Sequence, residues 1–355
     1  MNCEAISSTL KSLRIHECND TAPTIMPMNS TDSQVRVAVL GAGAVGSYFG
    51  GMLARAGSQV TLIARPAHVE AIRAGGLFLD AVSFQERVAI GASVEVSAAR
   101  DADVILFCVK TTDTEEAARL LAPHLAKGAV VVSLQNGVDN VARIRAASGI
   151  EALPAVVYVA AALPEPGHVK HSGRGELVVG ELKGSGSADT SQPSRAERVA
   201  SLFTSAKVPF RISPDIEVDL WTKFIMNCAG NAVTAITQTS YASAARNEHT
   251  REVMRQAIAE TVAVGRASGV ALPEVDFISM GLKFLESISD QATSSTAQDL
   301  ARGKRTEIDS LNGYVVRRGK ELGIGTPVSF TLVALVKLLE EKAAEPQRTA
   351  QASSK

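Results

Sequence analysis

One short motif constrains the fold of this chain more than any other feature. The run Gly41-Ala42-Gly43-Ala44-Val45-Gly46 matches G-x-G-x-x-G, follows an apolar stretch at residues 35–40 and opens a helical segment. In that setting Gly41 permits a tight turn, Gly43 lets a pyrophosphate approach the backbone, and Gly46 lets the helix pack closely on the strand. Amides at the helix N-terminus attract phosphate groups. The motif therefore predicts a Rossmann-type domain that binds a dinucleotide through this run.

Short runs rich in Val, Ile and Leu alternate with Ala-rich helical stretches up to about Ile212. They predict strands at residues 35–40, 59–64, 104–109 and 129–133. Apolar runs that are bounded by turns and separated by helices indicate an α/β fold, a doubly wound parallel sheet with helices on both faces. Two later runs, 167–171 and 175–180, flank Ser172-Gly173-Arg174 and predict a hairpin at the edge of the sheet.

The character of the sequence changes after Pro214. Strand-like runs stop, and helical periodicity continues to about residue 341, which predicts an all-helical C-terminal domain. Both ends of the chain are polar and lack periodicity, which is typical of disorder. The predicted organisation is a disordered arm at residues 1–33, a Rossmann domain at 34–213, a helical domain for substrate and catalysis at 214–342, and a disordered tail at 343–355.

Charge and composition exclude several classes of partner. The chain has 355 residues, with 36 basic and 37 acidic side chains and no block of like charge, so we expect no nucleic-acid partner. No apolar stretch reaches the ~18 residues of a membrane helix, and no signal-like segment opens the sequence. We therefore expect a cytoplasmic protein, either a monomer or a homodimer. The four cysteines are scattered, and His168 and His171 lie near no third ligand, so we expect no metal site.

Residues after the predicted strands indicate which nicotinamide cofactor binds. In an NAD-specific domain, an acidic side chain at the end of the second strand binds the ribose hydroxyls. Here that strand ends in Arg65, which suits the 2′-phosphate of NADP, the alternative being a solvated surface arginine. Lys110 and Asn136 follow the next two strands and would face the cofactor crevice. The alternatives for these two are a solvated lysine and an Asn-Gly turn.

Lys223, Asn227 and Asn231 recur every four residues in an otherwise apolar helical stretch. This spacing places them on one face of a helix whose other sides are buried. Buried polar groups without partners cost about 1–3 kcal/mol each, so these side chains need partners, either a ligand or neighbouring backbone. A ligand is favoured, because burial lowers the pKa of a lysine and lets its ammonium donate a proton to a ketone that receives a hydride.

A second polar cluster spans residues 293–309. Ser295-x-x-Gln298 fits a capping box, and Thr306-x-x-Asp309 resembles a helix N-cap. Glu307 lies near a predicted helix start, where a carboxylate complements the helix dipole. The residues alone therefore leave open whether Ser295 or Glu307 touches a substrate.

The sequence resembles the ketopantoate reductases from residue 35 to about residue 339. The resemblance rests on W-x-K-x-x-x-N-x-x-x-N from Trp221 and T-E-I-D-x-x-N-G from Thr306, together with the glycine motif, Lys110 and Asn136 in the same order. It implies NADPH-dependent reduction of a small 2-keto acid, 2-dehydropantoate, to (R)-pantoate on the route to pantothenate and coenzyme A. It also implies a C-terminal domain like that of 6-phosphogluconate dehydrogenase.

The resemblance further implies roles for single residues. Lys223 is the general acid, and Glu307 binds substrate and helps to position that lysine. Asn136 lies near the nicotinamide and the lysine. The hydroxyl and carboxylate ends of the substrate are held by Asn227, Asn231 and Ser295.

Two other functions stay open at this point. A D-2-hydroxyacid dehydrogenase acting on a different branched 2-keto acid would use the same lysine and glutamate, although Arg65 argues mildly against it because such enzymes often use NAD. A non-catalytic NADPH sensor would use the fold for binding only and would need neither Lys223 nor Glu307.

Overall fold

A computed structural model describes residues 35–183 and 193–352 of the chain. The arm predicted at residues 1–33 lies outside the described residues. The strands are β1 (Arg36–Leu40), β2 (Gln59–Ile63), β3 (Leu77–Asp80), β4 (Gln85–Val88), β5 (Gly91–Ser93), β6 (Val104–Phe107), β7 (Val130–Ser133), β8 (Leu153–Glu165), β9 (His168–Val179) and β10 (Phe210–Ile212). Over the described residues they form one sheet in the order β4-β3-β9-β8-β7-β6-β1-β2-β5, and β10 pairs with β9.

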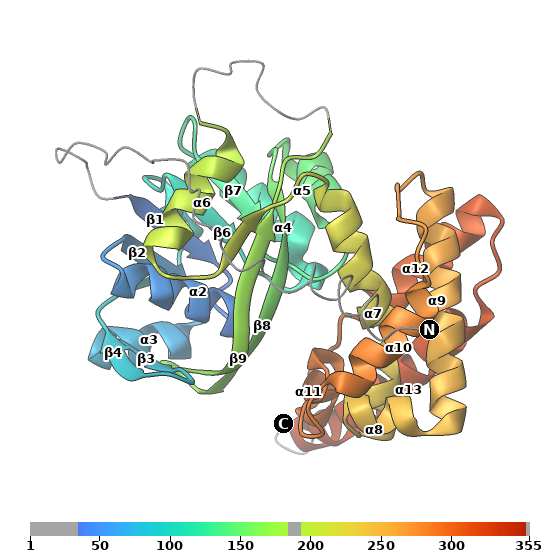
Figure 1. Cartoon of the computed structure of the whole chain (residues 1–355). Helices are drawn as coiled ribbons and strands as arrows, with labels where there is room; N and C mark the ends of the chain where they lie inside the picture. Colours follow the sequence, from blue (N-terminus) through green and yellow to red (C-terminus); the bar gives the residue numbers. More distant parts are fainter. Residues whose placement is uncertain (1–34, 184–192, 353–355) are drawn as a thin grey trace. The chain divides into compact units, whose positions relative to one another are not determined.

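The helices fall into two groups along the chain (Figure 1). Those among the strands are α2 (Ala44–Arg55), α3 (Pro66–Gly75), α4 (Thr114–Leu121), α5 (Asn140–Ser148) and α6 (Arg195–Ser205). Those after the last strand are α7 (Ile216–Thr237), α8 (Tyr241–Arg246), α9 (Glu248–Ala267), α10 (Phe277–Ser287), α11 (Ser295–Ala301), α12 (Asn312–Leu322) and α13 (Pro327–Ala352). Short 3-10 turns are η1 (Val96–Ala99), η2 (Thr111–Asp113), η3 (Ala122–His124) and η4 (Ile308–Ser310). None of the described helices is long and apolar enough to span a bilayer.

The central part of the sheet is parallel, in the order β5-β2-β1-β6-β7-β8. After β2 the chain forms β3 and β4 at the other end of the sheet, adds β5 beside β2, and then places β6 on the other side of β1. The strand order therefore reverses between β1 and β6. In open α/β sheets such a reversal leaves a crevice beyond the carboxyl ends of the strands, where ligands bind.

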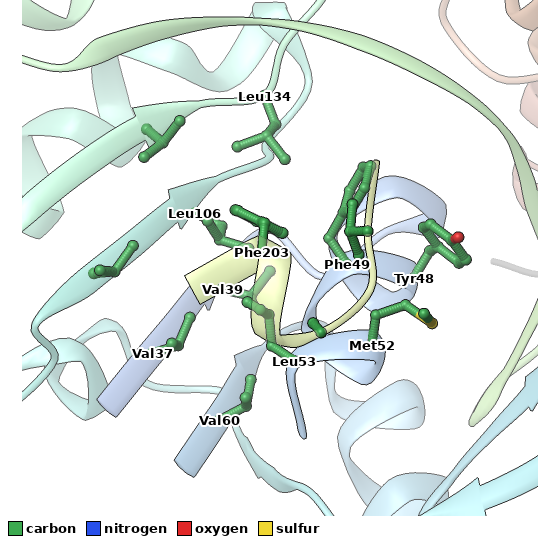
Figure 2. Packing of buried hydrophobic residues seen from close by; sticks show 14 of the residues in the cluster. Val37, Val39, Tyr48, Phe49, Met52, Leu53, Val60, Leu106, Leu134 and Phe203 are labelled. Carbon is green, nitrogen blue, oxygen red and sulfur yellow. The ribbon is translucent and has the colours of Figure 1, made fainter. Parts of the chain in front are cut away.

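Both faces of this parallel part are covered. Val39 of β1 lies in a core with Phe49 of α2 and Phe203 of α6, as Figure 2 shows. The next residue, Leu40, points to the opposite face and packs in a second core with Leu121 of α4. Successive side chains of a strand alternate between faces, so the continuous apolar runs reflect burial on both sides. The Rossmann-type doubly wound prediction is confirmed.

The hairpin predicted around Ser172-Gly173-Arg174 is wrong. Those residues lie inside the single strand β9, and the reversal comes earlier, at Gly167 between β8 and β9, where φ is +76°. Moreover, β9 pairs with β8 on one side and β3 on the other, so it is no edge strand. The glycine-rich stretch forms a bulge instead, with a register shift between Tyr158 and Val159 of β8.

Only helices follow β10 within the described residues, in agreement with the predicted all-helical part. The long helix α7 lies at its centre: Phe224 and Ile225 are buried with Ile258 of α9 and Val336 of α13. The predicted end of the last helix at Lys342 differs from the structure, in which α13 continues to Ala352. Alanine, glutamate, glutamine and arginine make up most of this extension and favour a helix, whereas Pro346 within it does not.

Replacing Phe49 with alanine tests the first core. Phe49 is fully buried and meets Phe203 edge to face with ring centroids 5.9 Å apart, so we expect Phe49→Ala to lower the free energy of unfolding by about 3–5 kcal/mol. The measurement is the midpoint of urea unfolding, monitored by circular dichroism. Val82→Ala is the matched control, because Val82 is 72% exposed and its loss should change the midpoint little. An equal effect of the two substitutions would contradict this description of the core.

Candidate active site

The glycine motif forms the loop between β1 and α2. Gly41 has φ +87°, and a Cβ built there would lie 2.7 Å from the backbone nitrogen of Val109. The amides of Gly41 and Ala42 both donate to the carbonyl of Ile63 at the end of β2, at 3.1 and 3.0 Å. Contacts with the neighbouring strands therefore fix the loop and require a glycine at position 41.

Gly43 and Gly46 need glycine for different reasons. A Cβ on Gly46 would lie 2.8 Å from Cγ1 of Val39, so this glycine permits close packing of helix on strand. A Cβ on Gly43 would meet no protein atom nearer than 4.0 Å, so packing does not explain the second glycine. Gly43 is the N-cap of α2 and no side chain caps this end. An exposed, uncapped helix N-terminus with a bare backbone fits the pyrophosphate of a dinucleotide.

Arg65 lies where the sequence predicted it, directly after β2, and is the N-cap of α3. Its backbone carbonyl accepts from the amides of His68 and Val69, while its side chain is exposed. Among the described residues no carboxylate pairs with its guanidinium. Arg65 therefore comes just after the end of β2, to which the glycine loop is hydrogen-bonded. Its guanidinium is available there to bind an anionic group.

The turn after β7 carries Asn136. Gln135 anchors this turn, since its Nε2 donates to the carbonyl of Val109 at 3.0 Å and to Oγ1 of Thr114 at 2.8 Å. The amide of Asn140 in turn donates to the backbone carbonyl of Asn136 at 2.7 Å. These bonds leave the Asn136 side chain pointing toward α7.

Lys223 of α7 meets this turn. Its Nζ donates to Oδ1 of Asn136 at 3.0 Å and to the carbonyl of Val157 in β8 at 2.6 Å. The pKa of Lys223 is lowered from 10.5 to about 8, mainly by burial and also by the nearby cation of Arg174, while the carboxylate of Glu307 acts in the opposite direction. The structure thus brings together Lys223 and Asn136 and gives a buried ammonium that is ready to release its proton.

Asn227 lies one turn further along α7. A narrow cavity of about 10 Å³ connects it with Lys223, Asn136 and Phe224, so a keto acid enters only if this cavity widens. A larger cavity of about 410 Å³ lies beside Trp221 and Tyr314, but neither Lys223 nor Asn227 lines it. Cavity size alone therefore does not identify the site.

Asn231, the last residue of the predicted row Lys223, Asn227 and Asn231, already has protein partners. Oδ1 of Asn231 accepts from the Tyr241 hydroxyl at 2.7 Å, and its backbone carbonyl accepts from the Ser294 hydroxyl at 3.2 Å. The helix cap predicted at Ser295 is wrong by one residue: Ser294 caps α11 by accepting from the amide of Ala297. Ser295 is exposed at the first position of that helix, so its hydroxyl is not occupied by capping.

Glu307 does not contact Lys223 directly. Its Oε1 accepts from the amide and the hydroxyl of Thr111, at 2.9 and 3.0 Å, so its effect on the lysine is through charge. Beside it, Lys110 forms an ion pair of 2.9 Å with Asp299 and donates to the carbonyl of Arg305 at 3.0 Å. The turn after β6 is therefore bonded both to α11 and to the segment just before η4. Neither Thr111 nor Asp299 was predicted, and no local sequence pattern marks them.

The two histidines with H-x-x-H spacing point to different partners. His168 lies 3.6 Å from Asp80 and 3.5 Å from Glu165. His171 donates from Nε2 to the carbonyl of Arg174 and stacks on Tyr48. Among the described residues no group of three or more His, Cys, Asp or Glu side chains converges as metal ligands.

The fold and these residues define an oxidoreductase with a Rossmann-type domain and a helical domain. The family model for ketopantoate reductase PanE/ApbA matches residues 37–184, and the model for its C-terminal part matches residues 215–340. The chain belongs to the ketopantoate reductase family.

Relatives agree with this assignment over nearly their whole length. A 2-dehydropantoate 2-reductase of Archaeoglobus fulgidus is 36% identical over 86% of this chain and 98% of its own. The crystal structure of a PanE/ApbA family ketopantoate reductase from Ralstonia eutropha JMP134 is 49% identical, with a TM-score of 0.79, and covers 87% of this chain and 99% of its own. A D-mandelate dehydrogenase bound to NADH and anilino(oxo)acetate shares the fold, at 24% identity and a TM-score of 0.78 over 87% of this chain and 99% of its own.

Replacing Lys223 with methionine should stabilise the protein. Below pH 8 the lysine is charged in the folded and unfolded states, so its lowered pKa destabilises the fold by up to about 3 kcal/mol. Between pH 8 and 10.5 only the unfolded state binds the proton, so the wild type recovers this stability as pH rises. Urea unfolding should therefore show Lys223→Met more stable than wild type at pH 7, with a smaller difference at pH 10.

The control is Lys127→Met, because Lys127 is exposed and should show no such pH-dependent difference. A Lys223→Met protein that is less stable than wild type at pH 7 would contradict the destabilising burial of this charge.

Proposed function

We propose that this protein reduces 2-dehydropantoate to (R)-pantoate with NADPH, on the route to pantothenate and coenzyme A. The observation that carries the proposal is the buried ammonium of Lys223, held by Asn136 and Val157 beyond the carboxyl ends of the parallel strands. The relative from Archaeoglobus fulgidus, named 2-dehydropantoate 2-reductase, supports the choice of substrate.

Lys223 acts as the general acid in this proposal. NADPH, when bound, supplies a hydride to the keto carbon. An ammonium has three N–H donors, and two of them are used by Asn136 and Val157. The third is left for the substrate carbonyl oxygen, which becomes a hydroxyl when the proton is transferred. A pKa of about 8 keeps Lys223 mostly protonated at neutral pH and makes it a stronger acid than a free lysine.

Other residues bind and orient the substrate. Asn227 lines the cavity next to Lys223 and offers both a donor and an acceptor. Ser295 and Asn231 complete the substrate contacts, with Asn231 oriented by Tyr241. Glu307, fixed by Thr111, keeps a negative charge near the lysine and supports its protonated form. The amine of Lys110 is paired with Asp299. Only the exposed part of the Lys110 side chain therefore contacts the cofactor in this proposal.

The substrate assignment is tested by following NADPH oxidation with purified protein, 2-dehydropantoate and a panel of other 2-keto acids. We expect turnover with 2-dehydropantoate to exceed that with every other acid. Lys223→Met should then lower kcat by about 10²–10⁴-fold, the range for loss of a general acid, while NADPH binding stays intact. Faster turnover of another keto acid would assign the protein to a D-2-hydroxyacid dehydrogenase. Tight NADPH binding without any turnover would indicate a sensor.

Arg65 is proposed to select NADPH by meeting the 2′-phosphate. Arg65→Asp should lower the ratio of kcat/KM for NADPH to that for NADH by tenfold or more, roughly the value of one charge-assisted hydrogen bond. Arg100→Asp makes the same charge change at another exposed position and should leave the ratio unaltered. An unchanged ratio in Arg65→Asp would refute the role in cofactor choice.

A further inference from the structure

Two cations lie over one aromatic ring at the candidate site. The guanidinium carbon of Arg174 is 4.2 Å from the ring centroid of Tyr158, and Nζ of Lys223 is 5.7 Å from the same centroid. Tyr158 belongs to β8 and directly follows Val157, whose carbonyl accepts from Lys223. Burial raises the pKa of Tyr158 to about 12, so this ring stays neutral at ordinary pH.

A bulge in β9 places Arg174 there. Arg174 has φ +59°, which is uncommon for a residue with a side chain, and it lies between Gly173 and Gly175, both of which also have positive φ. The pairing of β8 with β9 shifts register at this point, so that Tyr158 lies opposite Glu176 and Val159 opposite Arg174. Bulges of this kind re-aim a side chain, and they are common beside active sites.

The bulge is anchored to the helix that follows the glycine loop. His171 donates to the carbonyl of Arg174 at 2.6 Å and stacks on Tyr48 of α2, with ring centroids 4.4 Å apart. A Cβ on Gly175 would lie 2.7 Å from the Tyr48 hydroxyl. The unusual backbone at Arg174 is thus set by packing against α2, which explains why the strained conformation persists.

The side chain of Arg174 is 44% exposed and is held by two contacts. Its Nε and Nη2 donate to Oε2 of Glu176 at 3.0 and 2.8 Å, while its planar face stacks on Tyr158. A ring contact and an ion pair together restrict a guanidinium more than either contact alone.

We propose that Arg174 is a positioning residue for the general acid: its fixed positive charge makes the ammonium of Lys223 release its proton more readily. This proposal rests on the proposed function only in taking Lys223 as the proton donor. A like charge nearby disfavours the protonated form of a lysine, and an acid whose pKa lies nearer neutral pH transfers its proton more easily.

The charged groups that act on Lys223 oppose each other. Arg174 on β9 lowers its pKa, and Glu307 before η4 raises it. Glu176 pairs with Arg174 and opposes the effect of its charge, yet the cation of Arg174 still lowers the pKa of Lys223. The cation of Arg174 on β9 and the carboxylate of Glu307 in the helical part therefore act together on the pKa of Lys223.

The test is the pH at which Lys223 loses its proton in Arg174→Met and Arg174→Gln. Removing the positive charge should raise this pH by roughly half a unit or more, the order of size for a partly screened charge. The conservative variant Arg174→Lys should restore the wild-type value. Arg55→Met is the matched control, because the guanidinium of Arg55 also lies over a ring, that of Phe84 at 4.1 Å, and also pairs with a carboxylate, that of Glu86.

Two measurements separate this inference from the proposed function. As the pH is raised, kcat with 2-dehydropantoate should begin to fall at a higher pH in Arg174→Met than in wild type. Titration of ¹³Cε-labelled lysine by NMR, with the Lys223 signal assigned from Lys223→Met, reports the same shift without any turnover. An inactive wild type would refute the proposed function and leave the NMR result to decide the inference.

An unchanged Lys223 titration in both Arg174→Met and Arg174→Gln would overturn the inference. So would a raised KM for the keto acid with an unchanged pH profile, because Arg174 would then be a ligand of the substrate carboxylate. A shift shared by Arg55→Met would overturn it as well, because the effect would not be local.

Discussion

The burial of one ammonium group, that of Lys223, organises the site. Helix α7 is apolar around most of its surface and is therefore buried against neighbouring elements, although it also carries the cation of Lys223. An unpaired buried charge is unstable, so acceptors have to come from elsewhere in the fold. The turn after β7 supplies Asn136, and β8 supplies the carbonyl of Val157. The position of α7 against the sheet is thereby tied to the chemistry of a single side chain.

A second set of polar contacts joins the turn after β6 to the segment around η4. Glu307 binds Thr111 through both its amide and its hydroxyl, and Lys110 pairs with Asp299. Arg143 of α5 donates to the carbonyl of Thr111 and pairs with Glu115, so the same short turn is held from three sides. These bonds fix where the Glu307 carboxylate lies, and with it the electrostatic setting of the lysine.

The parts of this protein that could be predicted from the sequence are those with local causes. The β1–loop–α2 unit follows from three glycines and an apolar run, and the Lys223 row follows from helical spacing. The short strands β4 and β5 were not predicted, because they are partly exposed and lack an apolar run. The β9 bulge was mistaken for a turn, since glycines with positive φ serve both. Ser295 was taken for a cap because Gln298 completes the capping-box pattern with it, whereas the actual cap, Ser294, has no such partner. The partners of Lys110 and Glu307 lie more than 180 residues away.

Three features of the site each go against a local rule of stability. The N-terminus of α2 lacks a side-chain cap at Gly43, Lys223 is a buried cation, and Arg174 has a positive φ. A chain selected for stability alone would cap the helix, replace the lysine with an apolar residue and place glycine or asparagine at position 174. Departures of this kind cluster where a protein binds and reacts. The three departures are linked by direct contacts, because Lys223 and Arg174 both lie over the ring of Tyr158 and the bulge that carries Arg174 packs through His171 on Tyr48 of α2.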